Sequence, residues 1–160
     1  MNSENQKFVY VTLIKTTPDK LWEALITPDF SMKYFLGTRV ESDWKIGSKV
    51  VYRRGNDITD EGVVLKFEPP RLLSYTFHHV WREELRNEAP SRVTFEIGKL
   101  ADEPALGLKG DAVRLTVTHE DFPSNSKVFL AISKGWPVIL SGLKTLLETG
   151  HDLSVAKVVS

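Results

Sequence analysis

Hydrophobic and polar residues follow two different periods along the chain. From residue 38 to residue 119, apolar positions recur every second residue in short segments, as in antiparallel strands with one buried face. Turn-forming residues such as Gly55-Asn56-Asp57 separate these segments. The pattern, with a β-branched and aromatic run at the start of the chain, predicts strands near residues 8–14, 38–44, 48–54, 60–68, 71–81, 91–98 and 112–119.

Helical signals stand on either side of the six later strands. Thr17-Pro18-Asp19 and Thr27-Pro28-Asp29 each combine a capping hydroxyl, a proline suited to the first helical position and an acid that complements the helix dipole. They predict helices over 18–26 and 28–36. From 127 to 149 apolar residues recur every three or four positions, which predicts a long helix. We expect Pro137 to kink or divide this helix and Gly150 to end it.

The order of these elements predicts an α+β fold. One strand, two short helices, six strands and one long helix are buried most economically by a helix-grip arrangement, a curved antiparallel six- to seven-stranded sheet wrapped around the C-terminal helix. A chain of 160 residues has the length of one domain, so we expect a single domain over 1–160 with a core at 8–150 and terminal tails at 1–7 and 151–160. The oligomeric state stays open between a monomer and a homodimer, because an exposed edge strand could pair with a second copy.

Composition narrows the functional classes. Lys and Arg total 21 and Asp and Glu total 21, and this zero net charge argues against a nucleic-acid partner. No apolar run approaches the roughly 20 residues of a membrane-spanning helix. The chain has no cysteine, which excludes disulfides, thiol nucleophiles and thiolate metal sites and is compatible with the cytoplasmic location that we expect.

The four histidines do not form a recognisable metal site or catalytic motif. His78 and His79 are adjacent in a predicted strand and so point to opposite faces, and no spacing typical of metal ligands occurs. There is no Gly-x-Ser-x-Gly elbow and no phosphate-binding loop, so we expect no metal and no cofactor. Acid–base chemistry by His79, His119, Tyr75 or Glu61 stays open as an alternative to their simpler interpretation as polar residues at strand ends.

An ordered set of short motifs covers residues 8–150. On these motifs the chain resembles the C-terminal domain of the activator of the heat-shock-protein-90 ATPase, a member of the START/SRPBCC helix-grip superfamily that also includes the birch pollen allergen. The motifs are Thr17-Pro18, Leu21-Trp22-Glu23-Ala24-Leu25, Tyr34-Phe35, Ser42-Asp43-Trp44-Lys45-Ile46-Gly47-Ser48, Gly62-Val63-Val64, Pro69-Pro70-Arg71-Leu72-Leu73-Ser74-Tyr75, Leu115-Thr116-Val117-Thr118-His119, Gly135-Trp136-Pro137 and Leu146-Leu147-Glu148-Thr149-Gly150.

The resemblance implies a hydrophobic cavity between the sheet and the long helix. Members of the superfamily hold lipids, polyketides, flavonoid-like aromatics or other small apolar molecules there, and a minority catalyse reactions in it. We therefore expect this protein to bind a small, largely apolar ligand. The alternatives are a cyclase- or hydrolase-like enzyme in the same cavity and a cofactor of a heat-shock chaperone ATPase, acting through its surface in a stress response.

The candidate site centres on an aromatic strand. Alternation places Leu73, Tyr75, Phe77, His79 and Trp81 on one face, as a cavity wall or as ordinary core. The charged segment 82–88 that follows is a lid, a partner surface or a solvated connection. In the strand near 60–68 we expect Val63, Leu65 and Phe67 to face inward and Val64 outward. The full set of expected cavity-lining residues is Tyr34, Val63, Leu65, Tyr75, Phe77, His79, Trp81, Phe95, Leu115, Val117, His119, Trp136 and Leu140, with the hydrogen bonds to the ligand expected from Tyr75, His79 and His119.

Overall fold

The computed structural model describes residues 6–100 and 110–153, and within these ranges one antiparallel sheet holds seven strands. The strands are adjacent in the order β1-β7-β6-β5-β4-β3-β2. Their bounds are β1 (Phe8–Ile14), β2 (Arg39–Ser42), β3 (Lys49–Arg54), β4 (Asp57–Glu68), β5 (Leu72–His79), β6 (Ser91–Lys99) and β7 (Val113–Glu120). This sheet and its helices confirm the predicted α+β helix-grip architecture. Most of the two predicted tails, 1–7 and 151–160, lies outside the described residues.

Two short helices, α1 (Pro18–Ile26) and α2 (Pro28–Tyr34), separate β1 from β2. As predicted, Thr17 caps α1, because its hydroxyl accepts the backbone N–H of Lys20 at 3.2 Å. Thr27 begins α2 without a side-chain capping bond, and its own N–H still donates to Glu23 of α1. The second helix ends at Tyr34, two residues earlier than the pattern predicts.

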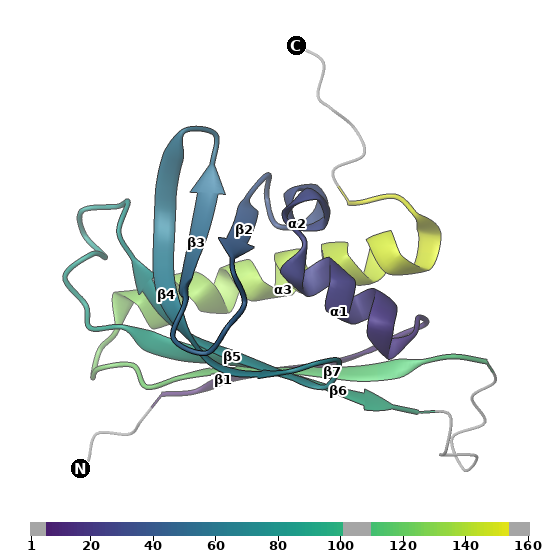
Figure 1. Cartoon of the computed structure of the whole chain (residues 1–160). Coiled ribbons are helices and arrows are strands. Elements are labelled where there is room, and N and C mark those ends of the chain that lie inside the picture. The colour runs from purple at the N-terminus through teal and green to yellow at the C-terminus, as the bar shows by residue number, and fades with distance from the viewer. Residues whose placement is uncertain (1–5, 101–109, 154–160) are drawn as a thin grey trace.

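The long helix α3 (Lys127–Thr149) runs across the concave side of the sheet. Figure 1 shows it above β1, β7, β6 and β5, while β3 and β4 rise beside it, so the sheet curves around the helix. Ser126 caps its start, and Gly150 ends it in the left-handed conformation at φ 84°, as predicted. The helix is not divided at Pro137, which lies within a continuous helical segment.

The core lies between α3 and the concave face of the sheet. It is made by inward-facing residues of every long strand and by one face of α3 and α1. Because side chains alternate along a strand, every second residue of β6 and β7 is buried, as the period of two predicts. The most completely buried side chains include Leu21, Leu73, Val93, Leu115, Leu140 and Leu143.

The predicted orientation of β4 is wrong for Val63 and Leu65. Val63 is 40% exposed and Leu65 is 38% exposed, whereas Val64 faces the core at 1%. The pairing of β4 with β5 passes from Val64 opposite Tyr75 to Lys66 opposite Ser74, which leaves Leu65 as an extra residue in a β-bulge. A strict period of two cannot hold across such an insertion, so Val64 and Phe67 both pack inward although three positions separate them.

Trp81 is also misplaced by simple alternation. The strand β5 ends at His79, and the chain then leaves the sheet, so the side chain of Trp81 is not held on the inner face. Trp81 is 49% exposed.

None of the helices in residues 6–100 and 110–153 is long and apolar enough to cross a membrane.

Candidate ligand cavity

A cavity of about 160 Å³ lies between the sheet, α3 and the connection between β5 and β6. We call this connection, residues 80–90, the strap. The cavity wall combines residues from the C-terminal end of α2 and the loop after it, from β3, β4 and β5, from the strap and from α3. These residues are Phe35, Leu36, Tyr52, Arg54, Asp60, Phe77, His79, Arg82, Leu85, Val128, Ala131, Ile132, Gly135, Trp136 and Ile139.

Four aromatic rings form one side of this wall. Phe35 lies edge-on to Tyr52 at 5.0 Å and to Trp136 at 5.6 Å between ring centroids. Tyr52 lies edge-on to Phe77 at 5.6 Å. Edge-to-face contacts of this kind stabilise aromatic clusters beyond the burial of their area. The wall is therefore a packed, pre-formed surface.

A buried hydrogen-bond chain holds the Trp136 ring in place. The indole Nε1–H donates to Nδ1 of His119 at 3.0 Å, and Nε2 of His119 lies 2.7 Å from the hydroxyl of Ser91. Because Nδ1 accepts, we assign the proton to Nε2, and the Ser91 hydroxyl then donates to the carbonyl of Phe77 at 3.3 Å. Burial lowers the pKa of His119 to about 3, because it penalises the imidazolium form. His119 is thus a neutral positioning residue behind the wall.

A second polar cluster lies in the wall itself. Nδ1 of His79 lies 2.8 Å from Oδ1 of Asp60, and the other carboxylate oxygen accepts the hydroxyl of Thr59 at 2.7 Å. Nε2 of His79 accepts the backbone N–H of Arg82 at 2.9 Å, which assigns the proton to Nδ1. His79 therefore joins β4 to the strap, with both ring nitrogens engaged.

Two tyrosine hydroxyls meet beside the cavity. The hydroxyl of Tyr52 lies 2.5 Å from that of Tyr75, and either can donate. The pair carries two hydroxyl protons and uses one of them in this bond; among residues 6–100 and 110–153 no acceptor engages the other. Burial raises the pKa of both tyrosines, so both hydroxyls stay protonated. When Tyr75 donates to Tyr52, the hydroxyl proton of Tyr52, which lines the cavity, is the spare one.

The strap covers one end of the cavity and is anchored at both ends. Leu85 is buried among the lining residues, and Nε2 of His78 lies 2.8 Å from the carbonyl of Arg86. At the far end, the carboxylate of Glu88 accepts the Ser126 hydroxyl at 2.6 Å and the Lys127 N–H at 2.7 Å. The strap is thus tied to β5 and to the start of α3, and the charged run 82–88 contributes a buried leucine to the wall.

The expected site residues divide into four groups. Three of them, Phe77, His79 and Trp136, line the cavity. Tyr34 is buried beside α1, where its hydroxyl donates to the carbonyl of Ala24 at 2.9 Å. Val63, Leu65 and Trp81 are exposed, which contradicts their expected place in the wall. The rest are core residues that do not line this cavity, namely Tyr75, Phe95, Leu115, Val117, His119 and Leu140.

Several lining residues are absent from the sequence-based set. Tyr52 and Arg54 share the inner face of β3, and the alternation of Val50, Tyr52 and Arg54 could have revealed them. Asp60 and Leu85 gave no comparable signal. The inward turn of Asp60 accompanies its bond to His79, and Leu85 stands alone in a charged segment.

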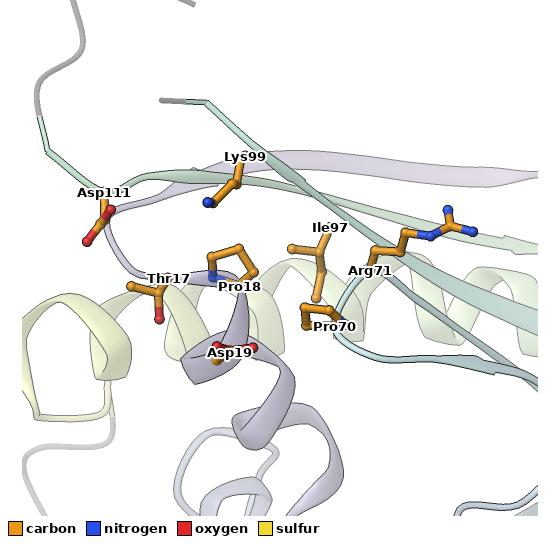
Figure 2. Close-up of a pocket in the computed structure, with 8 residues that line it drawn as sticks. All are labelled: Thr17, Pro18, Asp19, Pro70, Arg71, Ile97, Lys99 and Asp111. Atoms are coloured by element: carbon orange, nitrogen blue, oxygen red, sulfur yellow. The ribbon is translucent and has the colours of Figure 1, made fainter. Parts of the chain in front are cut away.

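Two larger hollows lie outside the space between the sheet and α3. One of them, of about 510 Å³, is lined by Thr17, Pro18 and Asp19 at the start of α1 and by Lys99 and Asp111. Figure 2 shows the guanidinium of Arg71, which also lines it, pointing away from these residues. Its lining mixes charges of both signs and lacks the mainly apolar wall typical of small-molecule sites. The other, of about 450 Å³, lies between α2 and α3. The residues that the structure describes contain no cluster of three or more metal-binding side chains.

Comparison with known proteins places this arrangement in a family. The model of the family described as "Activator of Hsp90 ATPase homolog 1-like protein" matches residues 15–148. A search of curated proteins finds no match.

Solved structures share the fold at low sequence identity. An Aha1 dimer from Colwellia psychrerythraea superposes with a TM-score of 0.68 at 19% identity, over 91% of this chain and 98% of that one. An HSP90 activator from Plasmodium falciparum superposes with a TM-score of 0.68 at 19% identity, over 88% of this chain and 95% of that one. A protein from Cytophaga hutchinsonii superposes with a TM-score of 0.65 at 26% identity, over 92% of this chain and 98% of that one. With the family model spanning α1 to α3, this chain belongs to the Activator of Hsp90 ATPase homolog 1-like family and has its helix-grip fold.

Proposed function

We propose that this protein binds a small, largely apolar molecule in the cavity between the sheet, α3 and the strap. The observation that carries the proposal is the cavity wall, in which four interlocked aromatic rings and the aliphatic residues of α3 surround a few convergent polar groups. Ligand sites in proteins usually have this composition. The fixed orientation of Trp136 supports binding, because a pre-organised wall loses little conformational freedom when a ligand arrives.

The cavity volume favours a ligand smaller than a lipid, a polyketide or a flavonoid. Sites for drug-sized ligands measure about 300–1,000 Å³, whereas this cavity measures about 160 Å³. A dry cavity of about 150 Å³ lined by apolar residues can hold benzene. The proposed ligand therefore has about one six-membered ring.

Thermal unfolding with a panel of one-ring compounds tests this proposal. A compound present at about one hundred times its dissociation constant adds about 2.7 kcal/mol, which raises the midpoint by roughly 5–10 °C for a chain of this length. The control is Gly135→Leu, because Gly135 lines the cavity and a Cβ there meets no atom within 4 Å. We expect stabilisation of the native protein and none of the filled variant. No stabilisation by any compound, or equal stabilisation of both proteins, would contradict the proposal.

Acid–base catalysis in the cavity receives less support from the geometry. A general base needs a nitrogen or oxygen that can reach the substrate proton. Both ring nitrogens of His79 and both of His119 already have hydrogen-bond partners within the protein.

A co-chaperone role is a second candidate, and the family membership favours it. One structural neighbour is named as an HSP90 activator. This candidate predicts that the chain binds an Hsp90-type ATPase and accelerates its ATP hydrolysis through surface residues. The Gly135→Leu variant would then retain the stimulation. An ATPase rate that stays unchanged with the native protein would contradict this candidate.

A further inference from the structure

Two arginines stand in the wall of the cavity. Arg54 comes from the end of β3 and Arg82 from the strap. Arg54 is exposed, and among the described residues its side chain bonds only through Nε, which donates to the Thr38 hydroxyl at a long 3.4 Å. Within residues 6–100 and 110–153 it has no carboxylate partner. Arg82 pairs with Glu84 at 3.2 Å, with both side chains more than half exposed, and such a pair exchanges readily for another anion.

The charges in the wall leave one positive charge uncompensated. The charged lining residues are Arg54, Arg82 and Asp60, since His79 accepts the Arg82 N–H and is neutral in this structure. Both oxygens of Asp60 are already engaged, one by His79 and one by Thr59. The guanidinium donors of Arg54 thus have no acidic partner inside the wall. A planar guanidinium binds a carboxylate through two parallel hydrogen bonds more readily than it binds a neutral group.

The apolar side of the same cavity determines the size and the apolar character of the rest of the ligand. Phe35, Phe77 and Trp136 line a space that fits about one six-membered ring. When Tyr75 donates to Tyr52, the spare hydroxyl proton of Tyr52, which also lines the cavity, adds a second donor for the ligand. Two arginine cations and a hydroxyl donor beside a ring-sized apolar space are complementary to a molecule with one ring and an anionic acceptor group.

The geometry points to a small aromatic carboxylate, of the size of benzoate, as the ligand class of this cavity. The ring lies among Phe35, Phe77 and Trp136, and the carboxylate accepts hydrogen bonds from Arg54, with Arg82 beside it. This inference rests on the proposed function, because it uses the same cavity, and it adds the charge that the ligand must carry.

Titration calorimetry with benzoate and benzyl alcohol tests the inference. The two ligands share a ring, and only benzoate carries a charge. At low ionic strength, where charge interactions are least screened, we expect benzoate to bind about ten-fold more tightly. Arg54→Gln should remove about that factor for benzoate and leave benzyl alcohol within a factor of about two.

The neighbouring arginine supplies a matched control. Arg53 points to the other side of β3, where its Nε pairs with Glu41 at 3.2 Å, and it does not line the cavity. Arg53→Gln removes the same charge from the same strand, so we expect it to leave both affinities unchanged. Both substitutions affect side chains at the surface, which leaves the fold intact.

Three results would overturn the inference. Benzoate could bind no more tightly than benzyl alcohol, Arg54→Gln could weaken both ligands equally, or Arg53→Gln could weaken benzoate as much as Arg54→Gln does. If benzyl alcohol binds to the native protein, fails to bind to Gly135→Leu and outcompetes benzoate, the proposed function stands and the carboxylate inference alone fails. Binding of neither ligand would contradict both.

Discussion

At the scale of single residues, the same amino acid has different roles according to its packing. His119 is fully buried, donates to Ser91 and accepts from Trp136, so it fixes the cavity wall without touching the cavity. His79 lies in the wall and joins Asp60 to the strap. Gly135 faces open space, while Gly142, seven residues later in α3, lies against Tyr34. These contrasts lead to predictions in which a nearby residue of the same type, or a variant that does not titrate, serves as the control.

The two helical glycines should respond oppositely to alanine. Gly135→Ala adds a Cβ where no atom lies within 4 Å, so we expect it to raise the free energy of unfolding by about 0.5–1 kcal/mol through helix propensity. In Gly142→Ala the new Cβ would lie 3.4 Å from the carbonyl oxygen of Tyr34, a tight contact that offsets this gain. Urea unfolding of both variants measures the difference. Equal stabilisation by both would show that Tyr34 does not constrain Gly142.

The depressed pKa of His119 predicts a pH-dependent stability. Its pKa is about 3 in the folded protein and 6.5 in the unfolded chain, so between these values the unfolded chain binds more protons. Neutral His119 thus makes its full contribution to the free energy of unfolding above pH 6.5. This contribution is lost as the pH decreases toward 3, by at most about 1.4 kcal/mol per pH unit.

The control for this pH dependence is His119→Gln. The glutamine amide can accept from the Trp136 indole and donate to Ser91, but it does not titrate. Urea unfolding between pH 7 and pH 5.5 should show a steeper loss for the native protein than for the variant. Parallel curves would mean that His119 takes up its proton in the folded state.

At the scale of elements, the strap depends on a bond to a different element. Glu88 accepts the Ser126 hydroxyl and the N–H groups of Lys127 and Val128, at the positive end of the α3 dipole. Replacing Glu88 with Ala should therefore lower the free energy of unfolding by about 1–2 kcal/mol and speed the hydrogen exchange of residues 80–90. Glu84→Ala, which removes only an exposed pair with Arg82, is the matched control. Similar exchange in both variants would contradict the anchoring role of Glu88.

The elements themselves were largely predictable, and the interruptions of their periods were not. The capping triplet before α1 and the alternation in β6 and β7 placed these elements correctly, because local propensity and burial agree there. The bulge at Leu65 depends on pairing with β5, which no local pattern encodes, and it reversed the expected faces of Val63 and Val64. Leu85 enters the wall because of tertiary anchoring of the strap, so its charged neighbours concealed it.

At the scale of the whole molecule, the cavity between the sheet, α3 and the strap is small, at about 160 Å³. Large side chains, among them Trp136, Phe95 and Tyr75, fill the region between α3 and the middle of the sheet, and the cavity lies toward β3, β4 and the strap. Seven of the residues predicted to line a cavity are instead buried away from it. The pattern of inward-facing residues was predictable, but the remaining volume depends on how side chains from different elements fit together.

The central claim is that this space accepts a ligand, and methyl NMR spectra during a titration with toluene test it most directly. Toluene carries no charge and has one ring, so its binding requires only an accessible apolar cavity of this size. We predict saturable shifts at Ile132, Ile139, Val128 and Leu85, which line the cavity, and none at these methyls in Gly135→Leu. Unchanged spectra of the native protein, or shifts confined to exposed methyls such as those of Val9 and Val11, would contradict the account.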